Sequence, residues 1–149
     1  MGYRSDITAV FYAQDRQENK HKERNERNRA KLKLFVETNF PESLRGDDGF
    51  GGLSVFDTPT RLLYEFTNTN VKWYDSYPEV MAFERFFGQF GDLCEKRVPD
   101  SPAEDVDTES VDWAAEFIRI GENTDDIEER SLGEADWLLR VSRTIETDY

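Results

Sequence analysis

Carboxylates are the side chains through which this sequence could do chemistry, and they are concentrated in one segment. Fourteen of them lie between Val98 and Asp136, where only Arg119 and Arg130 offset them and leave a formal charge of −12. The whole chain of 149 residues carries −13. A field of this sign repels nucleic acid and attracts proteins that normally bind nucleic acid.

Part of this segment has the spacing of a calcium-binding loop. Asp105, Asp107 and Glu109 take the first, third and fifth positions of such a loop, and Glu116 takes the twelfth. Ser110, however, stands where the loop requires glycine for its sharp turn. We therefore interpret the spacing as chance in an acid-rich segment, and we predict no bound metal.

Other catalytic patterns are missing from the sequence. The single histidine, His21, lies in a charged polar stretch, and the single cysteine, Cys94, lies in an aromatic run that predicts a buried thiol. There is no glycine-rich phosphate loop and no cysteine–histidine metal spacing. We therefore expect no enzyme activity and no cofactor. The lone cysteine and the lack of a long apolar run favour a cytoplasmic protein that does not contact membranes.

Hydrophobic periodicity predicts a mixture of strands and helices. The predicted strands are Ser5–Tyr12, Leu53–Phe56, Arg61–Thr67 with a continuation to Trp73 after a turn at Asn68–Asn70, Ala115–Ile120, Asp126–Leu132 and Trp137–Ile145. The predicted helices are a polar one from Asp15 to Asn39 and a phenylalanine-rich one from Pro78 to Glu95. This order predicts a single α+β domain over residues 1–149, with an antiparallel sheet of four to six strands and two helices packed on one face. The sheet should contain Ser5–Tyr12, Arg61–Trp73, Ala115–Ile120 and Trp137–Ile145.

Two charged segments stand out from this core. The acidic connector, residues 98–112, follows the second helix. The basic helix, Arg16–Lys33, has eight cations against three glutamates, and we expect it to project from the domain. It has no aromatic residue to stack on bases, so we predict a solvated helix, or one docked on an acidic patch, and no direct contact with nucleic acid.

The spacing of the carboxylates leads to the main functional hypothesis. Along an extended chain, alternate side chains project to the same side about 6.5–7 Å apart, which is close to the separation of neighbouring phosphates on one DNA strand. The predicted phosphate substitutes are Asp105, Asp107, Glu109, Asp112, Asp126, Glu128 and Glu129. A protein that mimics DNA and blocks a DNA-binding surface is one hypothesis. An acidic interaction or accessory protein without mimicry is the alternative, and a nucleic-acid-binding module that uses the basic helix is a further one.

Several short stretches resemble small accessory proteins of tailed bacteriophages. They are Met1–Asp6, Val71–Tyr74, Tyr77–Val80, Phe117–Glu122 and Asp125–Glu129. The size and acidity are also similar to phage DNA-mimic inhibitors. These resemblances imply an inhibitor in the cytoplasm of an infected bacterium, with a host DNA-binding protein as its partner. Gyrase is the first expected target, and a restriction, CRISPR or recombination nuclease is the next. A homodimer would lengthen the charged surface. The resemblances imply no catalytic residues.

Overall fold

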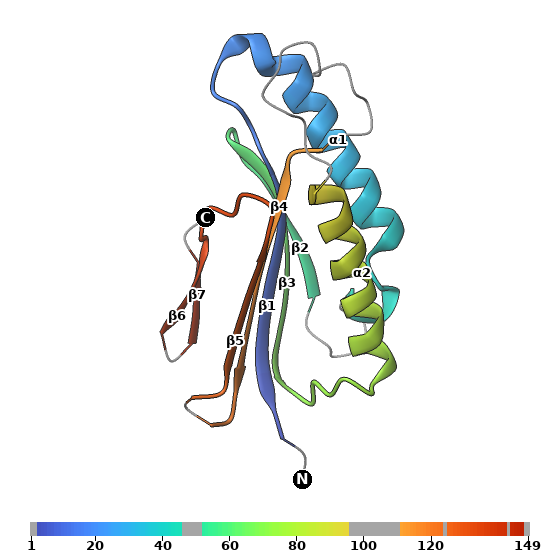
Figure 1. Ribbon diagram of the computed structural model, residues 1–149, viewed down its shortest axis with the longest axis vertical. Helices are drawn as coiled ribbons and strands as arrows, with labels where there is room; N and C mark the ends of the chain where they lie inside the picture. Colours follow the sequence, from blue (N-terminus) through green and yellow to red (C-terminus); the bar gives the residue numbers. More distant parts are fainter. Residues whose placement is uncertain (1–2, 46–51, 96–110, 124, 143, 148–149) are drawn as a thin grey trace.

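The computed structural model describes residues 3–45, 52–95, 111–123, 125–142 and 144–147 (Figure 1). Its core is a five-stranded sheet with the order β2-β3-β1-β4-β5, covered on one face by two helices. The elements are β1 (Ser5–Gln14), α1 (Lys22–Asn39), β2 (Gly52–Asp57), β3 (Arg61–Val71), α2 (Pro78–Glu95), β4 (Trp113–Gly121), β5 (Ile127–Leu132), β6 (Leu139–Ser142) and β7 (Thr144–Thr147). The predicted α+β class, with both helices on one face, is confirmed.

The connectivity of the sheet is that of a split β-α-β unit. β1 pairs antiparallel with both β3 and β4, and β2 pairs antiparallel with the outer side of β3. Helix α1 therefore connects β1 to β2 across β3, and helix α2 connects β3 to β4 across β1. This connectivity is the ferredoxin-like arrangement. β5 extends the sheet beyond β4. This scaffold supports many unrelated functions, so the function has to be argued from the surface.

The main core lies between the sheet and the helices. Its centre is Phe11 of β1, whose ring lies 5.0–6.4 Å from five other rings, those of Phe40, Phe83, Phe86, Phe87 and Phe90. Four of these rings come from α2, whose apolar side chains recur at helical spacing. The predicted bounds of this helix, Pro78 and Glu95, are those observed.

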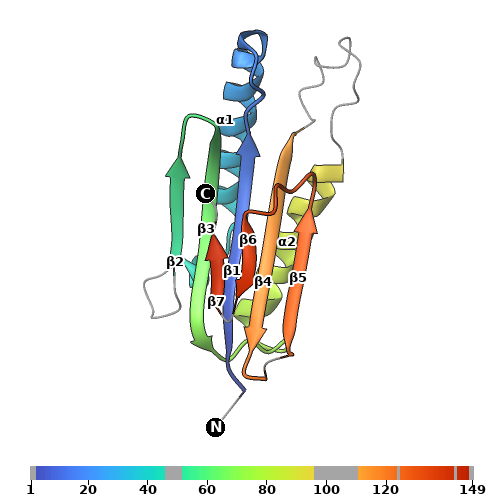
Figure 2. The same cartoon turned by 90° about the vertical axis from the view of Figure 1, so that its left-hand side faces the viewer.

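A second, smaller core covers the opposite face of the sheet. Tyr12 follows Phe11 in β1 and so faces away from the helices, where it packs among buried residues of the sheet and the hairpin β6–β7: Val10, Leu63, Ala114, Ile118, Leu138 and Leu139. Figure 2 shows the hairpin lying over this face, in front of β1. The prediction of one strand from Trp137 to Ile145 within the main sheet is therefore wrong. β6 and β7 pair with each other in a separate two-stranded sheet, and the buried Leu138 and Leu139 pack on the face of the main sheet instead of extending its edge.

Two other predicted boundaries are also wrong. The polar helix begins at Lys22, after a 3-10 turn over Asn19–His21, and not at Asp15. β1 continues to Gln14, and the carboxylate of Asp15 binds Arg29. The predicted turn at Asn68–Asn70 is part of β3. Asn70 takes a φ of 55°, which asparagine tolerates better than most residues, without ending the strand.

Candidate functional site

The acidic candidates that the structure describes do not form a single row. Asp105, Asp107 and Glu109 lie outside the described residues, as do residues 98–110 of the connector. Asp112 lies directly before β4. Asp126 lies at the other end of that strand, where its backbone C=O accepts a hydrogen bond from the N–H of Gly121. The length of β4 places these two carboxylates roughly 30 Å apart along the strand direction.

Asp112 is neutralised by the basic segment. Its Oδ2 lies 2.7 Å from Nη2 of Arg24 and 3.9 Å from Nε of Arg16. Its backbone is held as well, because the side chain of Asn28 bonds both its N–H and its C=O at 2.9 Å. Asp112 therefore joins α1 to the start of β4.

Asp126 and Glu128 are neutralised by Arg119 of β4. The guanidinium lies 2.9 Å from Oδ1 of Asp126 and 3.2 Å from Oε1 of Glu128. The phenol of Tyr3 donates a further hydrogen bond of 2.5 Å to Asp126. The hydrogen bond from Arg119 lowers the pKa of Asp126 below its usual value, and that from Tyr3 adds to the effect. A Cβ atom at Gly121 would collide with the ends of the Tyr3 and Asp126 side chains, so a larger residue there would displace them.

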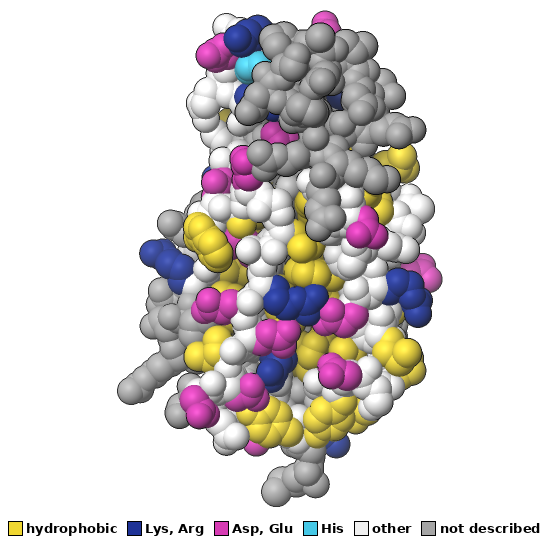
Figure 3. Space-filling view, in the orientation of Figure 1, with side chains coloured by type: hydrophobic (Ala, Val, Ile, Leu, Met, Phe, Trp, Pro, Cys, Tyr) yellow, Lys and Arg dark blue, Asp and Glu magenta, His cyan; other side chains and the backbone are white. Residues whose placement is uncertain are grey.

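Arg130 extends this network to the helices. It forms a bidentate pair with Glu84 of α2 at 2.7 and 2.8 Å and lies 3.5 Å from Glu128. Its guanidinium also stacks 4.2 Å above the ring centroid of Phe87. Figure 3 shows the corresponding surface, on which acidic and basic side chains are interspersed among apolar ones.

Glu129 differs from its neighbours in β5. Successive side chains of a strand point to opposite faces, so Glu128 and Arg130 face the helices while Glu129 faces the side that carries the hairpin. Glu129 is exposed and forms no ion pair within the described part of the chain. Of the four described candidates, it alone is free to meet a partner.

Two arginines of the basic helix, Arg24 and Arg29, are also bound to the protein itself. Arg29 binds Asp15 through two hydrogen bonds of 2.8 and 2.9 Å, Asp57 at 2.7 Å, and the C=O of Thr58 at 2.8 Å. The hydrogen bond to Asp15 raises the pKa of Arg29 above its usual value. Arg24 is bound to Asp112, as described above, so two of the helix's cations hold the helix to the strands.

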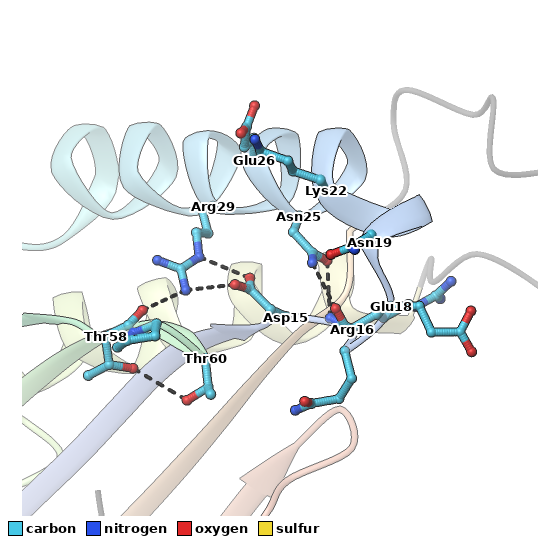
Figure 4. A pocket seen from close by; sticks show the side chains of 12 residues that line it. Asp15, Arg16, Glu18, Asn19, Lys22, Asn25, Glu26, Arg29, Thr58 and Thr60 are labelled. Atoms are coloured by element: carbon cyan, nitrogen blue, oxygen red, sulfur yellow. Dashed lines mark hydrogen bonds and ion pairs between the residues drawn. The ribbon is translucent and has the colours of Figure 1, made fainter.

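A polar pocket of about 420 Å³ lies where β1, the start of α1 and the turn between β2 and β3 meet (Figure 4). Its polar groups already satisfy one another. Asp15 is held by Arg29, and the Asn25 amide bonds the N–H and C=O of Arg16 at 3.1 and 3.0 Å. A carboxylate in a bidentate pair with arginine is a poor general base. This pocket is therefore better explained as a structural joint than as a catalytic site.

The other chemical candidates occupy structural positions. Cys94 is buried, as predicted, and its Sγ lies 3.4 Å from the C=O of Trp113. Glu116 is buried in β4, where both of its carboxylate oxygens accept hydrogen bonds. Within the described residues, no three His, Cys, Asp or Glu side chains gather where they could hold a metal ion.

The sequence did not reveal the group that holds the hairpin in place. Glu116 accepts hydrogen bonds from the phenol of Tyr12 at 2.7 Å and from the N–H groups of Leu138 and Leu139 at 3.0 Å each. Trp137 lies directly before these two leucines, and its side chain is 65% exposed. No local pattern marks these contacts, since they join residues 22 to 104 positions apart.

Comparisons with protein-family models, with curated proteins and with solved structures found no match to this chain. Among the described helices, neither is both long enough and apolar enough to cross a membrane.

Proposed function

We propose that this protein acts by binding another protein through an acidic surface, without catalysis of its own. The observation that carries the proposal is the placement of its cations. Arg24, Arg29, Arg119 and Arg130 are all engaged in ion pairs that hold strands and helices together. With these arginines paired inside the protein, the net charge of −13 leaves a surplus of carboxylates over cations.

The two faces of the sheet differ in how far their carboxylates are paired with arginines. Arg119 and Arg130, the cations of the acid-rich segment, both project toward the helices, where they meet Asp126, Glu128 and Glu84. The hairpin side carries the exposed carboxylates of Glu129 and Asp136, for which the described residues offer no ion pair. Arg61 and Arg140 also lie on this side, but with Glu65 its carboxylates outnumber them. The acidic surplus therefore favours the hairpin side as the binding surface.

A surface of this kind selects partners by charge. Proteins that bind nucleic acid carry basic surfaces and are attracted over a distance of about one Debye length, roughly 8–10 Å at physiological salt. Such association should be fast, and it should weaken as salt is added. We therefore propose a basic protein, of the kind that binds nucleic acid, as the partner.

Affinity capture from a bacterial lysate, followed by titration of the captured protein, tests this proposal. The double variant Glu129→Gln/Asp136→Asn should weaken binding. The matched control Glu23→Gln/Glu26→Gln removes the same charge from exposed positions on α1 and should weaken it less. Equal losses for the two variants would place the binding surface elsewhere. Binding that does not depend on salt would contradict the electrostatic basis of the proposal.

DNA mimicry by a phage-encoded inhibitor is the second, narrower candidate. It is supported by the charge of −12 between Val98 and Asp136 and by the phosphate-like spacing of alternate carboxylates. Because Asp112, Asp126 and Glu128 are paired with arginines, this role falls on Asp105, Asp107, Glu109 and Glu129.

Competition with duplex DNA distinguishes the two candidates. For a mimic, duplex DNA should displace the protein from a captured partner such as gyrase or a nuclease. The triple variant Asp105→Asn/Asp107→Asn/Glu109→Gln should then lose binding. A partner that binds equally well with DNA already loaded would leave the broader proposal standing and reject mimicry.

A further inference from the structure

Trp137 is held in a conformation that a bulky residue rarely adopts. Its φ is 56°, in the left-handed region, and its side chain is 65% exposed. Both features are unfavourable for an indole, since the backbone is strained and a large apolar surface remains in water. Strain of this kind persists only where the surrounding structure enforces it, and it is frequent at binding sites.

The surrounding structure does enforce it, from both sides of Trp137. On one side, the N–H of Asp136 donates to the phenol oxygen of Tyr12 at 2.7 Å. On the other, the N–H groups of Leu138 and Leu139 donate to Glu116 at 3.0 Å. Leu138 and Leu139 are themselves buried in the smaller core. The backbone is thus fixed on either side of the indole.

This arrangement requires a carboxylate inside the protein. Glu116 is 3% exposed, and its three donors, one phenol and two amides, are all neutral. Burying an ionised group without a countercharge is costly unless hydrogen bonds replace its hydration. An apolar residue would fill the same core without that cost, but it could not bind the amides that fix Trp137. The chemistry of Glu116 therefore fits a requirement to hold this turn.

We propose that Trp137 is the anchor of the binding surface, and that it receives an arginine side chain from a basic protein partner. This inference rests on the proposed function, because it assumes a cationic partner. Tryptophan is the best aromatic acceptor for a cation, and arginine can stack its planar guanidinium on the indole. The exposed carboxylate of Asp136, the preceding residue, supplies a second attraction for the same cation.

The charges on the hairpin side argue against other ligands for the indole ring of Trp137. Glu129 and Asp136 both lie on the hairpin side and are exposed, and with Glu65 they outnumber Arg61 and Arg140 of the same side. Phosphates of nucleic acids or of anionic lipids would be repelled by them, whereas a protein carrying arginine would not. A tryptophan on a rigid backbone also loses little conformational entropy on binding, which is why such residues dominate interface energies.

Binding of two peptides, ten-residue oligo-arginine and ten-residue oligo-lysine, tests the anchor. The full-length protein should bind oligo-arginine more tightly, because only guanidinium groups stack well on indole. Trp137→Ala should weaken oligo-arginine binding about three- to thirtyfold and remove the preference over oligo-lysine. Leu34→Ala, which truncates a side chain that is 69% exposed on α1, is the matched control and should change neither.

Fluorescence gives an independent measure of the same contact. Trp113 is buried and Trp73 is half-buried, so acrylamide should quench mainly Trp137 in the free protein. Oligo-arginine should protect this emission in the wild type. Glu116→Gln and Tyr12→Phe should reduce that protection and weaken binding even where circular dichroism shows a retained fold.

The outcomes separate the anchor from the proposed function. If Trp137→Ala binds oligo-arginine as tightly as the wild type, while binding still depends on salt and on Glu129 and Asp136, the anchor is wrong and the acidic surface stands. If the wild type binds neither peptide at low salt, both proposals fail. Protection of Trp137 by oligo-lysine equal to that by oligo-arginine would also overturn the anchor.

Discussion

The phenol of Tyr12 donates a 2.7 Å hydrogen bond to Glu116 inside the smaller of the two cores. These residues come from neighbouring strands, β1 and β4, and both face the hairpin. Each also accepts hydrogen bonds from the backbone that leads into β6. The pair therefore connects the central sheet to the hairpin.

Glu116→Ala should loosen the hairpin without unfolding the main sheet. The N–H groups of Leu138 and Leu139 would lose their acceptor, at a cost of about 1–3 kcal/mol for each donor that stays buried and unpaired. Urea denaturation measures the free energy of unfolding, and hydrogen exchange reports the two amides directly. Exchange that is accelerated at these amides but not in β1 is the expected result. Unchanged protection of both amides would show that Glu116 does not hold the turn.

Alkaline pH should destabilise the protein through Tyr12. Burial raises the pKa of Tyr12 well above its usual value of about 10. Because the pKa of Tyr12 is raised only in the folded state, the contribution of the neutral phenol to the free energy of unfolding is complete below pH 10. Above pH 10 it is lost, by up to about 1.4 kcal/mol per pH unit, since the unfolded phenol then ionises and the folded one does not. Denaturation curves of the wild type from pH 8 to 11 should show this fall, and those of Tyr12→Phe a shallower one. Parallel curves for the two proteins would refute the assignment to Tyr12.

The main core gives a prediction of larger size. Phe83 and Phe87 are 0% and 3% exposed, and both contact the ring of Phe11. Phe83→Ala or Phe87→Ala should lower the free energy of unfolding by about 3–5 kcal/mol through lost burial and the resulting cavity. Met81→Ala, on the exposed side of the same helix, should have little effect. A melting temperature that is unchanged in either phenylalanine variant would show that the core has been misplaced.

The basic helix should not bind nucleic acid with useful affinity. Its Arg24 and Arg29 are held by Asp112 and Asp15, so a phosphate would have to displace a carboxylate already in place. A gel-shift titration of duplex DNA or RNA at low salt should show no complex. A salt-sensitive shift that disappears in the variant Arg24→Ala/Arg27→Ala/Arg29→Ala would restore the nucleic-acid-binding alternative.

The sequence predicted those parts of the structure that depend on local patterns. The apolar side chains of α2 repeat at helical spacing and Pro78 marks its start, so both ends of this helix could be predicted. Residues 137–145 also alternate, but alternation only says that one side is buried and not which surface buries it. Whether this segment joins the sheet or packs on its face depends on Glu116, which lies more than twenty residues earlier.

The candidate site was harder to predict for the same reason. The charge of residues 98–136 is visible in the sequence, but the pairing of Asp112 with Arg24 joins residues 88 positions apart. The pairing of Asp126 with Arg119 spans a tight hairpin between β4 and β5, and carboxylates counted along the chain do not reveal it. The sequence therefore overestimates how many of these acids remain free for a partner.

Gly133 should be the glycine that is least tolerant of substitution near the hairpin. Its φ is 68°, and a Cβ atom there would collide with the backbone C=O of Trp113. Gly133→Ala therefore combines a left-handed backbone, which costs an L-residue roughly 1–2 kcal/mol, with a clash against backbone that cannot move aside. Gly88→Ala is the control, because a Cβ atom at that exposed helical position would meet no atom within 4 Å. Helix propensity predicts that this control stabilises the protein by up to about 1 kcal/mol. Thermal denaturation of both variants measures the difference, and a Gly133→Ala protein as stable as the wild type would mean that the chain leaves β5 by another path.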